Sequence, residues 1–448
     1  MNANPLTEQA EPWRKVPTDD PAPLAGVRVV DLSRALAGPY ATMMLADAGA
    51  DVIKVEPPSG DDSRGWLPFA EVGCHRESAY FLSANRGKRS VRLDLKTTDG
   101  ADRLRWLLGT ADVLVENYRP GVLDRLGFGP DAVRELNPRL VVLSLTGFGS
   151  TGPDGRRPGF DQIIQAEAGL MSLTGDPDGD PLRVGLPIAD ILAGMFGAYG
   201  VLTALRDRDR SGHGQQVDTS LLAAVVSIHA FHGAGYLATG NEPRRTGNRH
   251  PSIAPYGVFR CADTDIVIAV GSESLWQRAA AALDLDPEAT GMRTNAERVA
   301  NVGQVERAVD TALAHRTADE AVAQLAAAGV PAGRIRTLGE VYASPQVQHL
   351  GLIERMAHPT LGTVATLGRR CDGPAGTGPR QHTRRDWGSM RPKSSRATGP
   401  RPGRTSGREA DQVRDSRRRE ARSSMNNVRL ATARVADKLR DRDRHRGP

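Results

Sequence analysis

The sequence predicts an α/β protein with a Rossmann-like large domain, built on a parallel sheet, and a smaller α+β domain. Between residues 27 and 146, short aliphatic runs alternate with stretches of helical periodicity. Aliphatic strands separated by amphipathic helices are typical of βαβ units around a parallel sheet. With 448 residues, the chain is long enough for two or three domains.

The elements of the large domain follow from short patterns. Strands are expected in VRVVDL, DVIKVE, SVRLDL, DVLVEN and LVVLSLT, and helices in YATMMLADAG, GADRLRWLLGTA, VLDRLGF and AVRELNP. Pro39 suits the first turn of the helix that follows the first strand. The free N–H groups of that turn should face the carboxyl edge of the sheet, where such folds bind ligands.

A second region begins near Val217 and mixes both kinds of pattern. A helix is expected in TSLLAAVVSIHAFHGAGYL, a strand pair in VFRCADTDIVIAVG, and further helices in LWQRAAAALDL, QVERAVDTALAHR and ADEAVAQLAAAG. The turn-rich stretch TGNEPRRTGNRHPSIAPYG links the first helix to the strand pair. This region indicates the smaller α+β domain.

The net charge of +6 is unevenly distributed along the chain. Residues 369–448 hold 23 Lys and Arg against 9 Asp and Glu, which gives +14 and leaves −8 for the rest. Residues 371–412 contain no Leu, Ile, Val, Phe or Tyr, so we expect disorder there, with a charged helix over 425–445. Such a tail would bind nucleic acid only nonspecifically, because Trp387 is its one aromatic side chain.

The remaining composition excludes several classes. Three cysteines, Cys74, Cys261 and Cys371, do not make a disulfide framework and favour a reducing compartment. No window approaches the roughly 18 apolar residues of a membrane span, and the N-terminus lacks a signal-peptide core. We therefore expect a cytoplasmic protein without a membrane anchor. His229 and His232 have no third ligand at metal spacing, so no metal site is predicted.

One carboxylate stands out in RVGLPIADILAGMFGAYGVL, where Asp190 precedes an apolar run rich in Gly and Ala. It could serve as the N-cap of a helix. The small neighbours also leave room for a ligand to approach, so a functional carboxylate is the alternative.

Three other motifs are weak when taken alone. GFGSTG, residues 147–152, fits a dinucleotide fingerprint, but PDGRRPG follows it where a helix is required, so we expect only a loop. Arg86, Lys88 and Arg89 precede a strand and could hold phosphates or form a solvated turn. In ENYRPGVLDRLGF, the polar side chains surround a helix start.

Taken together, these stretches resemble one family over residues 24 to about 368. PLAGVRVVDLSRALAGPYATMMLADAGADVIKVEPPSGDDSRGW, NRGKRSVRLDLK, ADVLVENYRPGVLDRLGF, LNPRLVVLSLTGFGSTGP and SGHGQQVDTSL are similar to the family III CoA-transferases. That group contains formyl-CoA and carnitine CoA-transferases and the α-methylacyl-CoA racemases. The resemblance implies an interlocked homodimer, with acyl-CoA and a free carboxylic or dicarboxylic acid, such as succinate or glutarate, as substrates. It implies no permanently bound cofactor.

The resemblance also implies roles for particular residues. Asp190 corresponds to the aspartate that attacks the thioester and carries the covalent intermediate, a role that its reference pKa near 3.9 allows. Asp161 and Phe160 would support the acyl site. The implied CoA contacts are Arg34, Asn85, Lys88, Arg89, Asn117, Tyr118 and Arg125.

The chain departs from the family pattern at three places. Racemases carry a histidine base where this chain has Phe160, which favours a transferase over a racemase or epimerase. NRHPSIAPYG replaces the glycine run of formyl-CoA transferases. The family ending is replaced by PRQHTRRDWG, which suggests a reading-frame change near 367–370 and leaves an inactive chain as an alternative.

These observations divide the chain into five parts. They are an extension (1–23), a large CoA-binding domain (24–216), linkers with the small domain (217–345), a segment returning to the large domain (346–368) and the basic tail (369–448).

Overall fold

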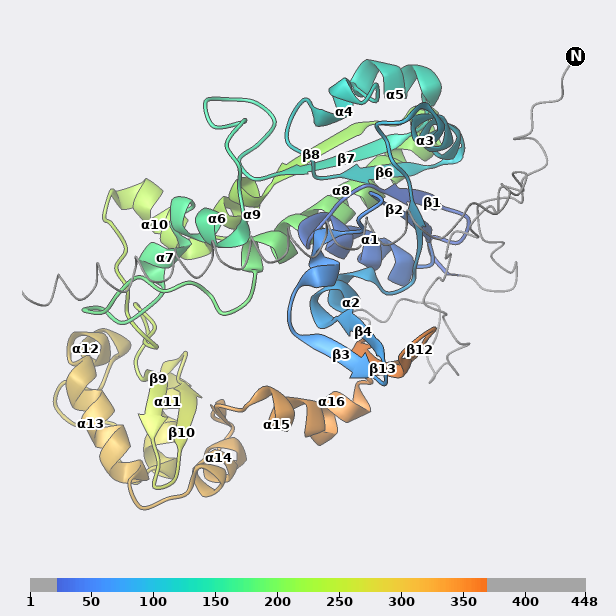
Figure 1. Cartoon of the computed structure of the whole chain (residues 1–448). Coiled ribbons are helices and arrows are strands. Elements are labelled where there is room, and N and C mark those ends of the chain that lie inside the picture. Colours follow the sequence, from blue (N-terminus) through green and yellow to red (C-terminus); the bar gives the residue numbers. More distant parts are fainter. Residues whose placement is uncertain (1–21, 369–448) are drawn as a thin grey trace, which may run out of the picture. The chain divides into compact units, whose positions relative to one another are not determined.

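The computed structural model describes residues 22–368 (Figure 1). Four expectations for the tail lie outside the described residues: its disorder, the helix over 425–445, the reading-frame change and nucleic-acid binding. The extension up to residue 21 lies outside them as well.

A six-stranded sheet, parallel throughout, forms the centre of the large domain. Its strands are β1 (Arg28–Asp31), β2 (Asp51–Glu56), β5 (Lys88–Arg92), β6 (Val113–Glu116), β7 (Val141–Thr146) and β8 (Gln216–Ser220). The order across the sheet is β5-β2-β1-β6-β7-β8. This is the doubly wound order, in which successive strands are added outward from β1 on one side and from β6 on the other. The predicted parallel sheet is confirmed.

Strand β8 was not predicted. Its sequence, QVDTS, has no aliphatic run, because it is an edge strand that pairs only with β7 and leaves alternate side chains exposed. The predicted domain boundary after residue 216 therefore falls inside a strand of the large sheet, behind its first residue. The sheet continues through Ser220.

Helices cover both faces of this sheet (Figure 1). The helices of this part are α1 (Ala37–Asp47), α2 (Ala79–Asn85), α3 (Thr98–Thr110), α4 (Val122–Arg125), α5 (Pro130–Leu136), α6 (Asp161–Glu167), α7 (Leu170–Leu173), α8 (Ile188–Ser211), α9 (Leu221–Ser227) and α10 (Ala230–Thr239). Helices α1, α8 and α9 share one hydrophobic core with the sheet, whereas α3 and α5 contribute to the core on the other face. The single helix expected over α9 and α10 is two helices, bent by 77°.

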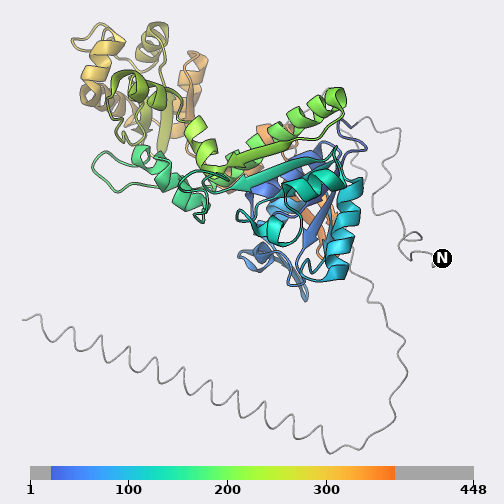
Figure 2. The same cartoon turned by 90° about the horizontal axis from the view of Figure 1, so that it is seen from above.

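Helix α8 runs along the sheet (Figure 2) and explains the small residues that follow Asp190. A Cβ atom added to Gly194 would lie 2.6 Å from the carbonyl oxygen of Ala37 in α1. One added to Gly197 would lie 2.9 Å from a methyl carbon of Leu143 in β7. These glycines therefore allow the helix to pack closely on α1 and on the sheet.

The composition of α8 corrects one expectation. By length and apolar composition, α8 could cross a membrane, with a mean hydropathy of 1.7 in its best window. The expectation that no window approaches a membrane span was therefore wrong. The packing of α8 against α1, β7 and α9 gives another reason for this composition, because a core helix is apolar as well.

A second, three-stranded sheet has its own hydrophobic core. Its strands are β9 (Tyr256–Arg260), β10 (Asp265–Ala269) and β11 (Ala332–Arg334), antiparallel in the order β11-β10-β9. Its helices are α11 (Glu273–Ala282), α12 (Asn295–Ala300), α13 (Val302–Leu313) and α14 (Ala318–Ala327). Trp276 is fully buried in this core. The predicted strand pair and the three predicted helices are confirmed.

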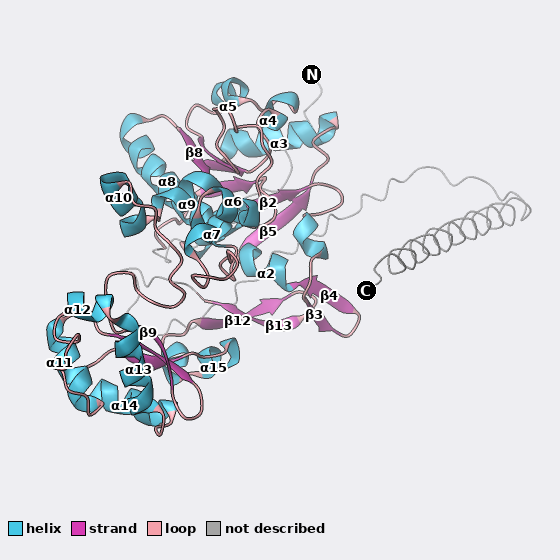
Figure 3. Ribbon diagram, turned by 90° about the vertical axis from the view of Figure 1, so that its left-hand side faces the viewer, coloured by secondary structure: helices cyan, strands magenta, loops and turns pink. Residues whose placement is uncertain are grey.

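The chain after β11 ends, within the described residues, in a hairpin that packs beside the large sheet's helix α2. Helices α15 (Leu338–Ala343) and α16 (Pro345–His349) lead to β12 (Ile353–His358) and β13 (Gly362–Leu367). Met356 and Leu361 of this hairpin cluster with Phe81 and Leu82 of α2. A second hairpin, β3 (Phe69–Val72) and β4 (His75–Ser78), lies next to it (Figure 3).

The close approach of α8 to α1 predicts the outcome of a matched pair of substitutions. Gly194→Ala should lower the free energy of unfolding by about 1–3 kcal/mol, because the new methyl group meets backbone. Gly109→Ala, in α3 with open space around it, should raise that free energy by about 0.5 kcal/mol through helix propensity. Chemical denaturation measures both. Equal effects of the two substitutions would contradict the packing argument.

Candidate functional site

The centre of the sheet, between β1 and β6, is where this fold class binds ligands. The loops that follow these two strands flank the crevice at the carboxyl edge. Arg34 lies in the first loop and Asn117 in the second. The backbone N–H of Arg34 donates to Asn117 Oδ1 at 2.8 Å, and Asn117 Nδ2 donates back to the carbonyl oxygen of Arg34 at 2.8 Å. Asn117 thus holds the two loops together.

A pocket of about 280 Å³ opens at this point. Its lining includes Arg34, Pro57, Pro58, Lys96, Tyr118 and Arg125. The guanidinium carbon of Arg34 lies 5.5 Å from the centre of the Tyr118 ring, which is a cation–π distance. The lining holds three cations against two carboxylates, Glu56 and Asp94. The excess of cations and the aromatic ring at the carboxyl edge suit a phosphorylated nucleotide.

The structure brings together four of the seven predicted CoA contacts, namely Arg34, Asn117, Tyr118 and Arg125. It places Lys88 in the interior, where its Nζ donates to Asp31 (3.0 Å), the Pro39 carbonyl (2.8 Å) and Asn85 (2.8 Å). All three donors of Lys88 are therefore used within the protein. Arg89 pairs with Asp51 on the neighbouring strand, with 2.5 Å between the closest atoms.

Lys96 was missed, although it belongs to the same basic segment. Lys88 and Arg89 begin strand β5, so they start at the amino edge of the sheet. Lys96 follows the end of that strand, at the carboxyl edge where the pocket lies. Position relative to the strand was the signal that could have found it.

Buried ionic groups hold the loop that carries Arg34. Lys54 Nζ donates to the Ser33 carbonyl at 2.7 Å and pairs with Asp61 at 2.9 Å. Burial alone would raise the pKa of Asp31, but Lys88 and Lys54, with hydrogen bonds from two hydroxyls, lower it to about 2. These buried charged groups hold the loop in place. Within the loop, Ala35 has a left-handed φ of 60°.

Asp190 is not an N-cap, so that alternative was wrong. Helix α8 begins after Pro187, which provides no side-chain cap, and Asp190 is its third residue. The cap comes from another helix, because Asp161 Oδ1 accepts a hydrogen bond from the Ala189 N–H at 2.8 Å. Asp161 therefore lies beside the start of the helix that carries Asp190.

This setting changes the proton affinity of Asp190. Burial and the negative charge of Asp161 raise its pKa to about 7. The carboxyl group is therefore partly protonated at neutral pH, whereas its reference pKa near 3.9 predicts full ionisation.

Tyr80 is a second group that the sequence did not reveal. Burial, with the charges of Asp190 and Asp161, raises its pKa to about 12. The ring packs edge-on against Trp66, with 4.8 Å between ring centres. This puts a protonated phenol in the electrostatic surroundings of Asp190. No motif or spacing around Tyr80 indicated that position.

Helix α1 connects the pocket to Asp190. Gly194, one turn after Asp190, touches Ala37 at the start of α1, and Arg34 precedes that start by three residues. Phe160, at the N-cap of α6, is 69% exposed beside Asp161. The cationic pocket and the partly buried carboxylate of Asp190 thus both lie near the start of α1.

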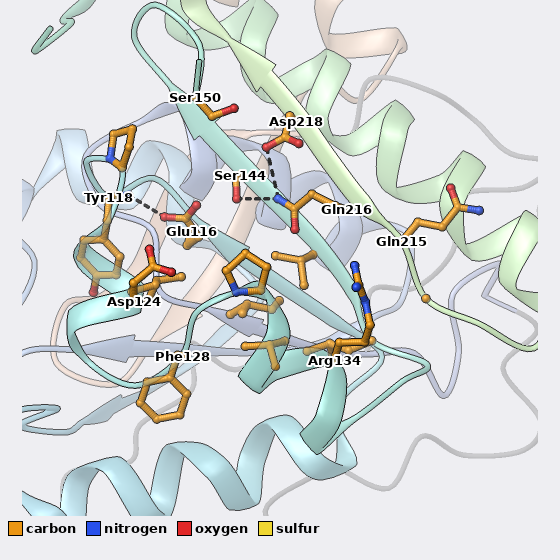
Figure 4. A pocket seen from close by; sticks show the side chains of 18 of the residues that line it. Glu116, Tyr118, Asp124, Phe128, Arg134, Ser144, Ser150, Gln215, Gln216 and Asp218 are labelled. Carbon is orange, nitrogen blue, oxygen red and sulfur yellow. Dashed lines mark hydrogen bonds between the residues drawn. The ribbon is translucent and has the colours of Figure 1, made fainter. Parts of the chain in front are cut away.

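A second pocket, of about 360 Å³, lies against β6, β7 and β8 (Figure 4). The strands present Glu116, Ser144, Gln216 and Asp218 to it, and Gln216 Nε2 donates to Ser144 Oγ at 2.9 Å. Burial raises the pKa of Glu116. Its lining holds three carboxylates, with Asp124 as the third, against the two cations Arg119 and Arg134. This balance makes it a poorer site for phosphates than the Arg34 pocket, where cations outnumber carboxylates.

Two further expectations concern motifs rather than pockets. No group of three or more metal-binding side chains was found within residues 22–368. His229 Nε2 lies 2.8 Å from the Ala168 carbonyl oxygen. GFGSTG lies in a loop, as predicted, because no helix follows β7 directly. The two ends of this loop are in backbone contact at Gly147 and Gly159.

The doubly wound sheet, with a cationic pocket at its centre, defines an α/β enzyme of the nucleotide-binding type. The model of CoA-transferase family III matches residues 24–382, so the chain belongs to this family. It is 42% identical to the succinate–glutarate CoA-transferase of Agrobacterium fabrum, over 74% of this chain and 84% of that protein. It is 40% identical to the acetyl-CoA:oxalate CoA-transferase of Acetobacter aceti, over 74% and 85%. A CaiB/BaiF family protein from Brucella suis matches in structure with a TM-score of 0.72 and 38% identity, over 79% and 93%.

The raised pKa of Asp190 predicts a pH-dependent effect on stability. Because the folded pKa of about 7 exceeds the ordinary value of 3.8, the folded state keeps a proton that the unfolded state releases between these values. The wild-type protein should therefore lose stability as the pH rises through this range, and Asp190→Asn should not. We expect the variant to gain on the order of 2 kcal/mol relative to wild type between pH 5 and pH 8. Denaturant titrations at both pH values measure the difference, and a constant difference would contradict the assignment.

Proposed function

We propose that this family III CoA-transferase moves CoA from an acyl-CoA donor to a free carboxylic or dicarboxylic acid through a covalent intermediate on Asp190. One observation carries the proposal. Asp190 is a partly buried carboxylate at the first turn of α8, one helical turn from the contact with the start of α1, where the nucleotide pocket begins. Partial burial reduces the solvation of the ionised carboxylate, which favours its attack on a thioester.

The proposed reaction has four steps. A carboxylate oxygen of Asp190 attacks the thioester carbonyl, the C–S bond breaks, and an acyl-aspartyl anhydride and CoA thiolate result. The thiolate then attacks the aspartyl carbonyl and releases the donor acid, leaving an aspartyl-CoA thioester. The acceptor carboxylate attacks this thioester, which forms a second anhydride and frees the thiolate. Attack of the thiolate on the acceptor acyl carbon yields the new acyl-CoA and restores Asp190.

The residues around the pocket have different proposed roles in binding CoA and in holding the site. Arg34, Lys96 and Arg125 line the pocket proposed for the CoA phosphates, and Tyr118 supplies a ring beside the nucleotide. Asn117 fixes the Arg34 loop. Asn85, Lys88 and Arg89 act from the interior, through the bonds that hold the sheet edge.

The acceptor is proposed to be a dicarboxylic acid. Two similar proteins are named for succinate and glutarate and for oxalate, which supports acids of this type. A racemase needs a base at the position of Phe160, whose ring takes up no proton. Asp161 beside it is already engaged as the cap of α8.

Chemical trapping tests the covalent intermediate. Hydroxylamine intercepts anhydrides and thioesters, so a hydroxamate should form on the peptide containing Asp190 only when an acyl-CoA is present. Asp190→Asn should fold, bind CoA and lose CoA transfer by at least about a thousandfold, because the amide is no nucleophile. Mass spectrometry of new acyl-CoAs, from a panel of acyl-CoAs and free acids, measures transfer.

The controls separate this carboxylate from its neighbour. Asp161→Asn keeps the nucleophile, so it should retain trapping at Asp190 at a reduced rate. Full activity of Asp190→Asn, or a hydroxamate on Asp161, would move the chemistry to another residue.

We also propose an interlocked homodimer, as in the family pattern. Helices α8 and α10 leave large apolar side chains exposed, including Tyr199 (70%), Phe231 (54%) and Leu237 (84%). A patch of this kind is typical of an interface. Light scattering after size exclusion should give twice the mass of 48.0 kDa. Leu237→Arg should shift the protein toward the monomer, and a wild-type monomer would contradict the proposal.

A further inference from the structure

Gln165 in α6 is fully buried, and its side chain makes three hydrogen bonds. Its Nε2 donates to Asp161 Oδ2 at 2.7 Å and to the Leu186 carbonyl oxygen at 3.3 Å. Its Oε1 accepts from the Val184 N–H at 2.8 Å. The exposed fraction of the residue is 0%. A buried amide with these partners rigidifies whatever it joins.

Gln165 connects α6 to the chain segment that precedes Asp190. Val184 and Leu186 lie in the segment that leads into α8, and Asp161 holds the Ala189 N–H in the first turn. Asp161 and Gln165 therefore fix the residues from 184 to 189 at three points, directly before Asp190. Helix α8 has no side-chain cap of its own to set this turn.

We propose that Gln165 is a positioning residue for CoA transfer, which fixes both the Asp161 carboxylate and the turn before Asp190. This inference rests on the proposed function of Asp190. Gln165 touches neither CoA nor the acids in this scheme, and it acts through Asp161 and the backbone.

The charges around Asp190 make the effect measurable. Among the described residues, Asp161 of α6 is the one charge that acts on the pKa of Asp190. The other titratable groups that face this part of α8 are the phenols of Tyr80 from α2 and Tyr40 from α1. Gln165 holds the Asp161 carboxylate in one orientation. The position of this negative charge relative to Asp190 therefore depends on Gln165.

An amide is required at this position, because the side chain donates to a carboxylate and accepts from an N–H. Gln165→Glu keeps the shape but removes the donor and adds a second negative charge against Asp161. Gln165→Met keeps the length but removes all three hydrogen bonds. The first variant changes mainly the electrostatics, and the second mainly the geometry.

The experiment compares kcat and KM across pH for wild type, both variants and the control Gln324→Glu. Gln324 is an exposed glutamine of α14, so its charge change should leave the profile unaltered. We expect Gln165→Glu to move the acid limb of kcat upward by about one pH unit. Gln165→Met should lower kcat by about 10- to 100-fold, with KM for acyl-CoA changed by less than about threefold, because the nucleotide pocket is on other loops.

A second measurement keeps the test independent of activity. In protein carrying ¹³C-labelled aspartate, the carboxyl signal lost in Asp190→Asn reports the titration of Asp190 in each variant. Wild-type protein without transfer activity would refute the proposed function and leave this titration as the test of positioning. Folded Gln165→Glu and Gln165→Met with wild-type titration and wild-type kcat would overturn the proposal. If Gln165→Glu does not fold, Gln165→Met is sufficient: an unchanged titration of Asp190 and an unchanged kcat in that variant would overturn the proposal.

Discussion

The hydrogen bond from the Ala189 N–H to Asp161 links the stability of the fold to the reactivity of the site. Helix α8 starts at a proline without a side-chain cap, so its free N–H groups need an acceptor from elsewhere. Asp161 supplies the acceptor at 2.8 Å, and its charge also opposes ionisation of Asp190. Partial burial, together with the charge of the carboxylate that completes the helix, raises the pKa of Asp190 to about 7. The proton affinity of this aspartate therefore depends in part on how α8 begins.

The carboxyl edge of the sheet is built on buried ion pairs rather than on apolar packing. Lys54 pairs with Asp61, and Lys88 pairs with Asp31, all of them almost fully buried. Such pairs contribute little to net stability, because removing the charges from water costs about as much as their attraction returns. What they provide here is geometry, since each lysine also binds a backbone carbonyl near the start of α1. These contacts therefore restrain the loop that carries Arg34.

Hydrophobic pattern was enough to predict most of this fold from sequence. Four strands of the large sheet, β1, β2, β6 and β7, are aliphatic, and the helices between them have clear periodicity. The two edge strands, β5 and β8, carry a much weaker signal, because their sequences are KRSVR and QVDTS. The site was harder to predict. The role of Asp190 came from resemblance, since its residue type and position alone favoured a helix cap. Lys88 and Lys96 differ only in which end of β5 they occupy. Tyr80 and Gln165 act through partners distant in sequence, and no local pattern encodes such contacts.

The reciprocal pair of hydrogen bonds between residue 34 and Asn117 uses only backbone atoms of residue 34. The loop is therefore held in the same way whatever side chain stands at that position. The backbone that shapes the pocket and the side chain proposed to contact the nucleotide are therefore independent of each other. The side chain at position 34 can therefore differ between relatives, or be changed to suit another nucleotide, while Asn117 still holds the backbone of this loop in place.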